Sequence, residues 1–200
     1  MGFFSSQKEP EVQQKVLCWV HDNERTYQQE MDAMSSFLTD LIQRATRENK
    51  EIVFLCVGSD RSIGDALGPL VGTMLKENGI AYQVYGTLEE PVHAFNLEHT
   101  WKTIQRQFRQ PFIISIDAGL GEREKVGAVL LKEGPLLPGR ALQKVLPAVG
   151  DYHLTGIVNY LDPLPAAQFL NDTRLYTVMK LARTIVQAIT TITNNQGCAN

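Results

Sequence analysis

The stretch Gly58–Pro69, with the sequence GSDRSIGDALGP, constrains the fold of this 200-residue chain more than any other segment. Residues 51–57 before it are apolar almost throughout, which is typical of a strand covered on both faces. Residues 67–75 after it repeat apolar side chains at the three- and four-residue spacing of a helix. A buried strand that leads through a glycine-bounded loop into a helix is characteristic of parallel α/β sheets.

The rest of the chain continues this alternation of strands and helices. Apolar residues at helical spacing predict a helix over 27–49, and the apolar segment 112–117 predicts a strand that ends in Asp117. This pattern favours a three-layer α/β/α sandwich with a mainly parallel, doubly wound sheet. The remaining predictions are strands at 81–88 and 126–133, helices at 96–108 and 174–189, a glycine-rich loop at 118–125, a turn at 134–139, a short strand with a helix start at 146–161, and a frayed end at 193–200.

The length of the chain suits a single domain, residues 1–200. Within it we expect residues 1–26 to be a flexible or peripheral extension, 27–49 an N-terminal helix, and 50–194 the α/β core. The N-terminal helix either adds a layer against the sheet or forms a dimer contact, so the oligomeric state stays open.

Composition and charge exclude several classes of protein. The net charge of −3 lacks the excess of positive charge that is typical of proteins that bind nucleic acids. No apolar run approaches the ~18 residues that cross a bilayer, and the first residues lack the features of a signal peptide. The three cysteines form no CxxC pair, which argues against a disulfide framework or a zinc ribbon. We therefore expect a cytoplasmic protein without a membrane or nucleic-acid partner.

The loop does not match a nucleotide-binding motif. Five residues separate Gly58 from Gly64, whereas a P-loop has four, and Asp65 stands where that motif has its lysine. The G-x-G-x-x-G pattern of dinucleotide-binding proteins is absent. Because an aspartate would repel a triphosphate, nucleotide binding at this loop is excluded.

Three aspartates follow predicted strands whose carboxyl ends meet at one edge of the sheet. In a doubly wound order the strands at 51–57 and 112–117 are neighbours. The loop with Asp60 and Asp65 then lies beside Asp117, in a crevice at the carboxyl ends of these strands. Two carboxyl groups a few ångströms apart share a proton. The ionised one takes a proton from water while the protonated one polarises a carbonyl, which is a route to amide hydrolysis.

A metal site is an alternative use of the same residues. Asp65, Asp117 and the imidazole of His153 together form an oxygen–nitrogen set that suits a divalent ion such as zinc or nickel. We expect no chemistry from the other histidines, which lie on a polar segment or a helix surface: His21, His93 and His99.

Each aspartate also has a purely structural role open to it. Asp65 follows Gly64 and opens a helix, so it is a candidate N-cap. Asp60 precedes Arg61, and the two suit an ion pair at the surface. Asp117 ends an apolar run and has backbone amides of the following loop within reach.

Three motifs, VGSDRSIGDALGPLVG, IDAGLG and GDYHLTGIVN, closely resemble the YyaC-type sporulation proteins of spore-forming bacteria. These resemble the germination protease that degrades small acid-soluble spore proteins and, more distantly, the hydrogenase maturation endopeptidases. The resemblance covers nearly the whole chain from about Lys50 onward. It implies a phosphorylase/hydrolase-like α/β/α sandwich, in agreement with the pattern of strands and helices.

The resemblance also implies roles for individual residues. The catalytic aspartates of the germination protease fall on Asp65 and Asp117. In the hydrogenase endopeptidases the first-loop acid binds nickel of the substrate protein together with a second acid and a histidine, and those positions resemble Asp65, Asp117 and His153. Two departures are a loop that begins Gly58-Ser59 instead of Gly-Asn, and the absence of the extra segments of the longer germination protease.

We therefore expect an endopeptidase-like hydrolase of the sporulating cell or spore, with Asp65 and Asp117 as its acid/base pair. Its substrate would be a protein or peptide, with small acid-soluble spore proteins as the implied class. The alternative is a non-catalytic sporulation protein that binds a partner protein or a divalent metal through the same pocket. The supporting residues of that pocket are Asp60 and His153, and its loops hold Gly58, Ser59, Gly64, Gly119 and Thr155.

Overall fold

The computed structural model describes residues 14–21, 25–138, 146–160 and 172–196. Its elements in chain order are β1 (Val16–Val20), α1 (Tyr27–Arg47), β2 (Glu51–Cys56), η1 (Gly64–Ala66), α2 (Leu67–Glu77), β3 (Gln83–Tyr85), α3 (Leu97–Gln107), β4 (Pro111–Gly121), η2 (Arg123–Lys125), β5 (Val129–Glu133), β6 (Tyr152–Tyr160) and α5 (Leu175–Gln196).

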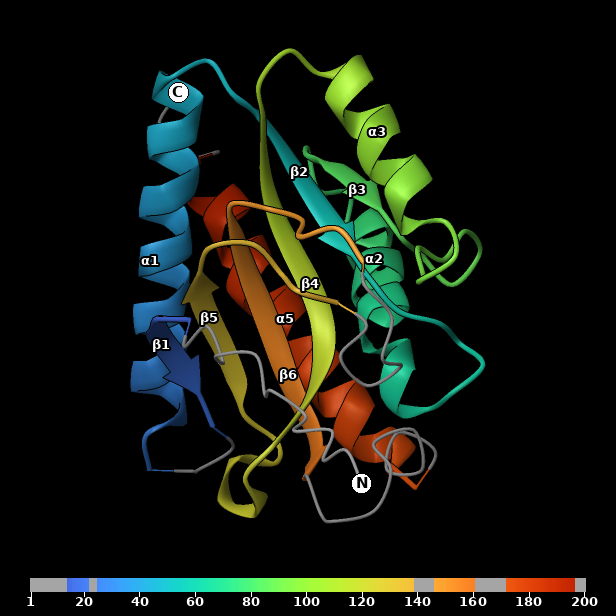
Figure 1. Ribbon diagram of the computed structural model, residues 1–200. Coiled ribbons are helices and arrows are strands. Elements are labelled where there is room, and N and C mark those ends of the chain that lie inside the picture. Colours follow the sequence, from blue (N-terminus) through green and yellow to red (C-terminus); the bar gives the residue numbers. More distant parts are fainter. Residues whose placement is uncertain (1–13, 22–24, 139–145, 161–171, 197–200) are drawn as a thin grey trace, which may run out of the picture.

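The strands form one six-stranded sheet in the order β1-β5-β6-β4-β2-β3 (Figure 1). The four strands β3, β2, β4 and β6 pair in parallel. β5 pairs antiparallel with β6 on one side and with β1 on the other. The predicted first and third strands, now β2 and β4, are neighbours, as the doubly wound order requires.

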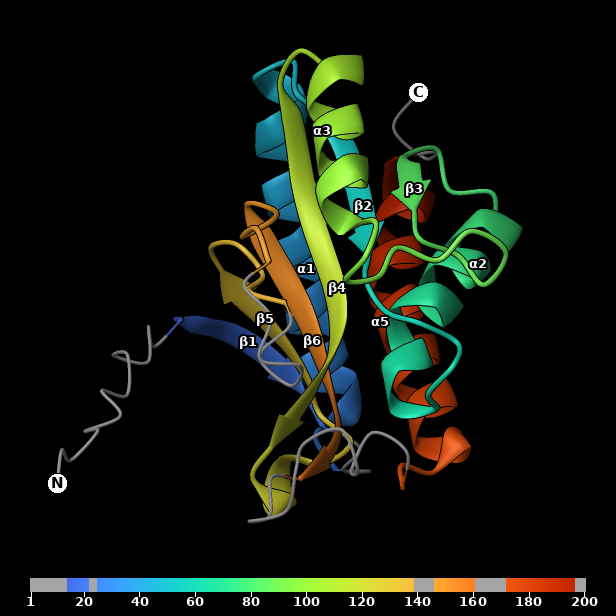
Figure 2. The same ribbon diagram turned by 45° about the vertical axis from the view of Figure 1, so that its right-hand side comes forward.

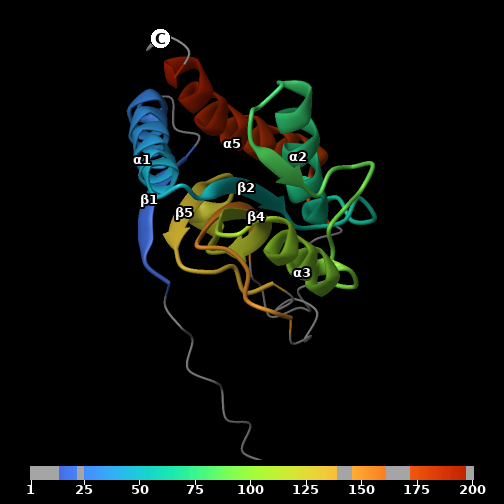
Figure 3. The same ribbon diagram turned by 90° about the horizontal axis from the view of Figure 1, so that it is seen from above.

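Helices cover both faces of the sheet, so the predicted three-layer α/β/α sandwich is confirmed. Seen from above, α1, α2 and α5 lie on one face and α3 on the other (Figure 3). Side chains of β4 alternate between the two layers: Ile114 packs in the core under α1, α2 and α5, and Ile113 packs in the core with Ile104 of α3. Among the described residues, no helix has the length and apolar character that crossing a membrane requires.

The first strand lies in a segment where we predicted none. β1 pairs antiparallel with β5, so the sheet begins before residue 50 and extends beyond the core predicted at 50–194. As an edge strand it leaves Val16 and Trp19 exposed, and its five residues are too short for a clear period-two pattern. Parts of four predicted segments lie outside the described residues: 1–13 and 22–24 of the extension, 139 of the turn, 161 of the mixed segment and 197–200 of the frayed end.

Two further segments differ from the prediction. β6 is a nine-residue strand, although a helix start was predicted within 146–161. It lies inside the sheet and is buried on both faces from His153 to Val158, so its sequence lacks the alternation that marks a half-exposed strand. β4 continues through Gly121, although residues 118–125 were predicted to be a loop (Figure 2). Its pairing with β6 supports this continuation, and the glycines hid it.

Ile114→Ala should lower the free energy of unfolding by about 2–5 kcal/mol, because it removes a fully buried side chain from the central strand β4. Val16→Ala, on the exposed edge strand β1, is the matched control and should change it by about 0.5 kcal/mol or less. Urea unfolding followed by circular dichroism measures both values. Equal effects of the two substitutions would contradict the described core.

Candidate functional site

The loop between β2 and α2 closes on itself at the carboxyl end of the sheet. Beyond the last β2–β4 pair, the Val57 N–H still donates to the carbonyl of Ile116 at 2.7 Å. The Ser59 N–H then donates to the Asp65 carbonyl at 3.1 Å, which draws the two ends of the loop together. Gly58 has a φ of +148°, and a Cβ there would collide with the Asp65 carbonyl oxygen. The loop geometry therefore requires glycine at this position.

Asp65 occupies the middle of η1, just before α2, and is half-buried. The N-cap position of α2 is Ala66, and neither η1 nor α2 has a side-chain cap hydrogen bond. The candidate N-cap role of Asp65 is therefore wrong, because Asp65 lies inside the short turn η1 and Ala66 occupies the cap position of α2. Its carboxyl group is left for other interactions.

Asp117 lies within β4 at the level where β2 has ended. The last pair between the two strands is Cys56 with Ile116, while Asp117 itself pairs with Thr155 of β6. Its side chain is partly buried, and its Oδ1 accepts a hydrogen bond of 2.8 Å from the Ala118 N–H. Asp117 was predicted to end its strand. β4 instead continues to Gly121, and Asp117 lies just after the last residue of β4 that pairs with β2.

Asp65 and Asp117 influence each other electrostatically. Burial and, secondly, the negative charge of Asp65 raise the pKa of Asp117 well above its ordinary value, against the opposing hydrogen bond from Ala118. Burial also raises the pKa of Asp65, but the Ser59 N–H and the charge of His93 act in the opposite direction. The pair is therefore asymmetric, because the surroundings raise the pKa of Asp117 more strongly than that of Asp65.

His93 is the residue of this site that sequence reasoning missed. We predicted no chemistry for it, yet it is half-buried and its charge acts on Asp65. The signal was present in the sequence: His93 follows the strand predicted at 81–88, a parallel neighbour of 51–57. The loops after parallel neighbours meet at one edge of the sheet.

His153 is not part of the aspartate pair. Its side chain is 1% exposed, and Nδ1 lies 2.9 Å from the carbonyl oxygen of Gly134 beside β5. Burial lowers its pKa, which keeps the ring neutral. It pairs with Ser115, two residues before the pair of Asp117 with Thr155 along the same two strands.

The metal site predicted as an alternative does not fit these residues. Within the ranges that the structure describes, no group of three His, Cys, Asp or Glu side chains is placed to hold a metal ion. The Nδ1 atom of His153 is already engaged by Gly134, and the carboxyl of Asp117 favours its protonated form, which is a poor ligand. As the structure places them, these residues do not form a site for a zinc or nickel ion.

The other residues predicted for the site lie at different places around Asp65 and Asp117. Ser59 is half-buried and Gly64 is buried in the loop beside Asp65. A Cβ on Gly119 would lie 2.5 Å from Thr155 Cγ2, so glycine lets β4 and β6 pack closely here. Asp60 is exposed and is not among the groups that shift the pKa of either aspartate.

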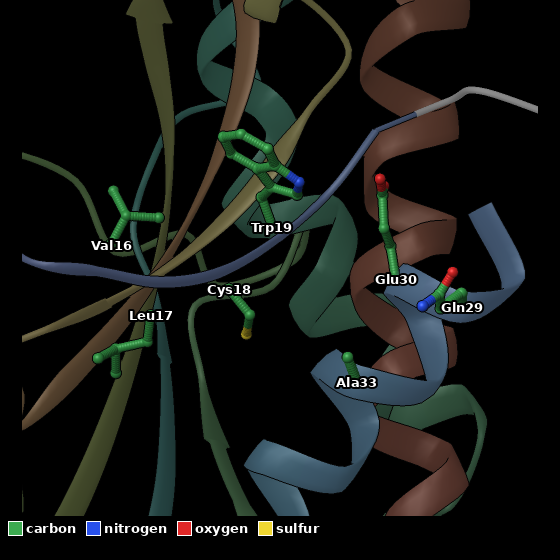
Figure 4. A pocket seen from close by; sticks show the side chains of 7 residues that line it. All are labelled: Val16, Leu17, Cys18, Trp19, Gln29, Glu30 and Ala33. Atoms are coloured by element: carbon green, nitrogen blue, oxygen red, sulfur yellow. The ribbon is translucent and has the colours of Figure 1, made fainter. Parts of the chain in front are cut away.

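Two hollows are described, and both lie away from the aspartates. The larger, of about 470 Å³, lies between β1 and α1 and is lined by Trp19 and Glu30 among others (Figure 4). The smaller is lined by polar residues of α1 and by Thr191 of α5. Neither contains Asp65 or Asp117, so a cleft at the pair stays a prediction.

Sequence comparison assigns the chain to a family. The family described as "Protein of unknown function (DUF1256)" matches residues 23–188. The chain belongs to the DUF1256 family. A curated relative, "Uncharacterized protein YyaC" of Bacillus subtilis (strain 168), is 40% identical over 189 residues, which cover 94% of this chain and 86% of that protein. The resemblance to YyaC-type proteins is thereby confirmed.

A solved structure also resembles this DUF1256 protein. It is the [NiFe] hydrogenase maturation protease HycI from Thermococcus kodakarensis KOD1, with a TM-score of 0.40 and 15% identity over 70% of this chain and 93% of that one. At this level of similarity, no residue role passes from HycI to the DUF1256 chain.

Asp117→Asn should stabilise the protein, and more so at high pH. The pKa of Asp117 is raised on folding, so the folded state binds more protons than the unfolded state between the ordinary and the raised value. Stability is therefore lost as the pH rises through that window, and the asparagine variant has no such loss. Its free energy of unfolding should exceed that of the wild type more at about pH 8 than at about pH 4.

Urea unfolding over this pH range measures the difference. Asp60→Asn is the control, since Asp60 is exposed, and it should follow the wild type. A constant gap between Asp117→Asn and the wild type at all pH values would show that Asp117 titrates as an ordinary carboxyl group.

Proposed function

We propose that this protein is an endopeptidase-like hydrolase in which Asp65 is the general base and Asp117 the general acid. The proposal is supported by the charge of Asp65, which raises the pKa of Asp117, and by the positions of the two residues, with Asp65 in the loop that follows β2 and Asp117 where the pairing of β4 with β2 ends. Perturbed carboxyl pairs of this kind are concentrated at sites of acid–base chemistry.

The asymmetry of the pair suggests how the chemistry would proceed. Ionised Asp65 removes a proton from a water molecule, whose oxygen attacks the carbonyl carbon of a peptide bond. Protonated Asp117 donates a hydrogen bond to the carbonyl oxygen as negative charge develops there. The proton taken up by Asp65 then passes to the leaving amine, the C–N bond breaks, and both aspartates return to their starting states.

The edge of β4 offers a place for an extended peptide. The carbonyl of Ile116 points toward β2, and by strand alternation the N–H and C=O of Ala118 and Leu120 point the same way. β2 has ended at this level, and among the described residues no strand pairs with this side of 118–121 (Figure 2). A substrate strand paired there would bring its backbone next to Asp117.

The biological setting belongs to the same proposal. The resemblance to sporulation proteins supports a cytoplasmic role in the sporulating cell or the spore. Small acid-soluble spore proteins are the substrates we propose to test first.

A second candidate is a non-catalytic protein that binds a partner through the same aspartates. It is favoured by the lack of any counterpart here to the extra segments of the longer germination protease. Such a partner would contact Asp65 and Asp117 without being cleaved, and it would still bind when either acid is replaced by asparagine.

Purified protein should cleave small acid-soluble spore proteins, and Asp65→Asn and Asp117→Asn should each lower kcat/KM by about 10²–10⁴-fold, the usual contribution of a general acid or base. Cleavage is followed by mass spectrometry of the products. Asp60→Asn is the matched control in the same loop and should retain wild-type activity. Equal activity of the wild type and the three variants would show that neither Asp65 nor Asp117 is catalytic. Binding of the spore proteins without cleavage would favour the second candidate.

A further inference from the structure

The exposed large apolar side chains of the described residues fall into two groups. One group, Val16 and Trp19, lies on the edge strand β1. The other lies in segments that follow the parallel strands β2, β3 and β6: Ile63, Leu88, Phe95, Leu175 and Tyr176. Segments that follow parallel strands gather at one edge of a sheet. The second group therefore lies at the same edge as Asp65.

Phe95 belongs to a turn that hydrogen bonds hold in place. The His93 N–H donates to the Asn96 side-chain oxygen at 2.7 Å, and the Asn96 side-chain amide donates to the Pro91 carbonyl at 2.9 Å. The Asn96 N–H donates back to the His93 carbonyl at 3.0 Å. The Phe95 side chain is nevertheless 86% exposed. Single exposed apolar residues are common on protein surfaces, so the position of this ring decides what it can do.

The turn is tied to the loop that holds Asp65. Val92, at the start of the turn, forms a parallel bridge with Val57, and its carbonyl accepts a hydrogen bond of 2.8 Å from the Gly58 N–H. The Val92 side chain is buried in the core on the α3 face of the sheet. Phe95 is thereby held on a fixed backbone that starts next to the candidate site.

Ile63 brings a second apolar side chain to the same edge of the sheet. It lies in the loop after β2, two residues before Asp65, and is 42% exposed. The free side of 118–121 in β4 faces the region beyond the end of β2, because the sheet has the order β6-β4-β2-β3 (Figure 2). A peptide strand paired there would lie next to the segments after β2 and β3, which carry Ile63 and Phe95.

We propose that Phe95 and Ile63 form an apolar subsite, which binds a large apolar or aromatic side chain of a peptide segment close to the bond that is cleaved. This inference rests on the proposed function and deepens it by naming the substrate class. Because folded proteins bury most such side chains, the substrate is an extended or unfolded segment of a protein. An aromatic ring on a fixed turn suits this task, since little conformational freedom is lost on binding.

Four variants test the proposal. Phe95→Ser and Ile63→Ser each remove one apolar side chain of the subsite, and Phe95→Tyr keeps the aromatic ring. Trp19→Ser is the matched control, since Trp19 is an exposed aromatic residue on β1, which β5 and β6 separate from β4. Because all three positions are exposed, the variants should keep the urea midpoint of the wild type.

The first readout is binding and needs no cleavage. The Asp65→Asn protein is incubated with immobilised peptides that share a threonine-rich background and differ in one central residue: phenylalanine, leucine, serine or aspartate. The phenylalanine and leucine peptides should bind about tenfold more tightly than the other two. In the same Asp65→Asn background, Phe95→Ser and Ile63→Ser should lose this preference, while Phe95→Tyr and Trp19→Ser should keep it. Equal binding of all four peptides, or binding of none, overturns the inference.

The second readout is the position of the cleaved bonds in the spore proteins, determined by mass spectrometry. In the wild type, large apolar residues should be concentrated next to these bonds. Phe95→Ser should lose this preference and raise KM by about tenfold with kcat nearly unchanged, as expected for a group that only binds substrate. Cleavage without an apolar preference overturns the inference and leaves the proposed function standing. Selective binding by a protein that cleaves nothing supports the subsite and removes the hydrolysis.

Discussion

The parallel pairing of β2 with β4 is the constraint on which the candidate site depends. Because both strands end in the same direction, the loop after β2 and the middle of β4 meet at one edge of the sheet, although they are distant in sequence. The hydrogen bond from Val57 to Ile116 fixes the last step of this register. A shift of one residue would turn the side chain of Asp117 to the other face and separate it from Asp65.

Two carboxyl groups in this position cost folding free energy. Each unit by which a pKa is raised on folding corresponds to about 1.4 kcal/mol of lost stability for the ionised group. The surroundings offset only part of this, through single backbone N–H groups from Ser59 and Ala118. Local rules are broken in this way mostly where function requires it. A core that served stability alone would place apolar side chains here.

The layers and the neighbouring first and third strands were predicted from the sequence, because strand burial and helical spacing are local signals. The convergence of two aspartates stays a prediction, which the effect of the Asp65 charge on the pKa of Asp117 supports. β1 and the extent of β6 were missed, because an edge strand and a strand buried on both faces lack the usual alternation. The continuation of β4 through Gly119 and Gly121 was also missed, since glycine indicates a loop unless the pairing partner is known. His93 was also overlooked, because its position beside the loop of Asp65 becomes visible only when the order of the strands in the sheet is known.

The coupling between the aspartates is tested most directly by the carboxyl titration of Asp117 in the wild type and in Asp65→Asn. Asp117 should titrate well above its ordinary range in the wild type, and at lower pH once the charge of residue 65 is removed. An ordinary pKa for Asp117, or one that does not respond to the substitution, would mean that the two carboxyl groups do not form a pair.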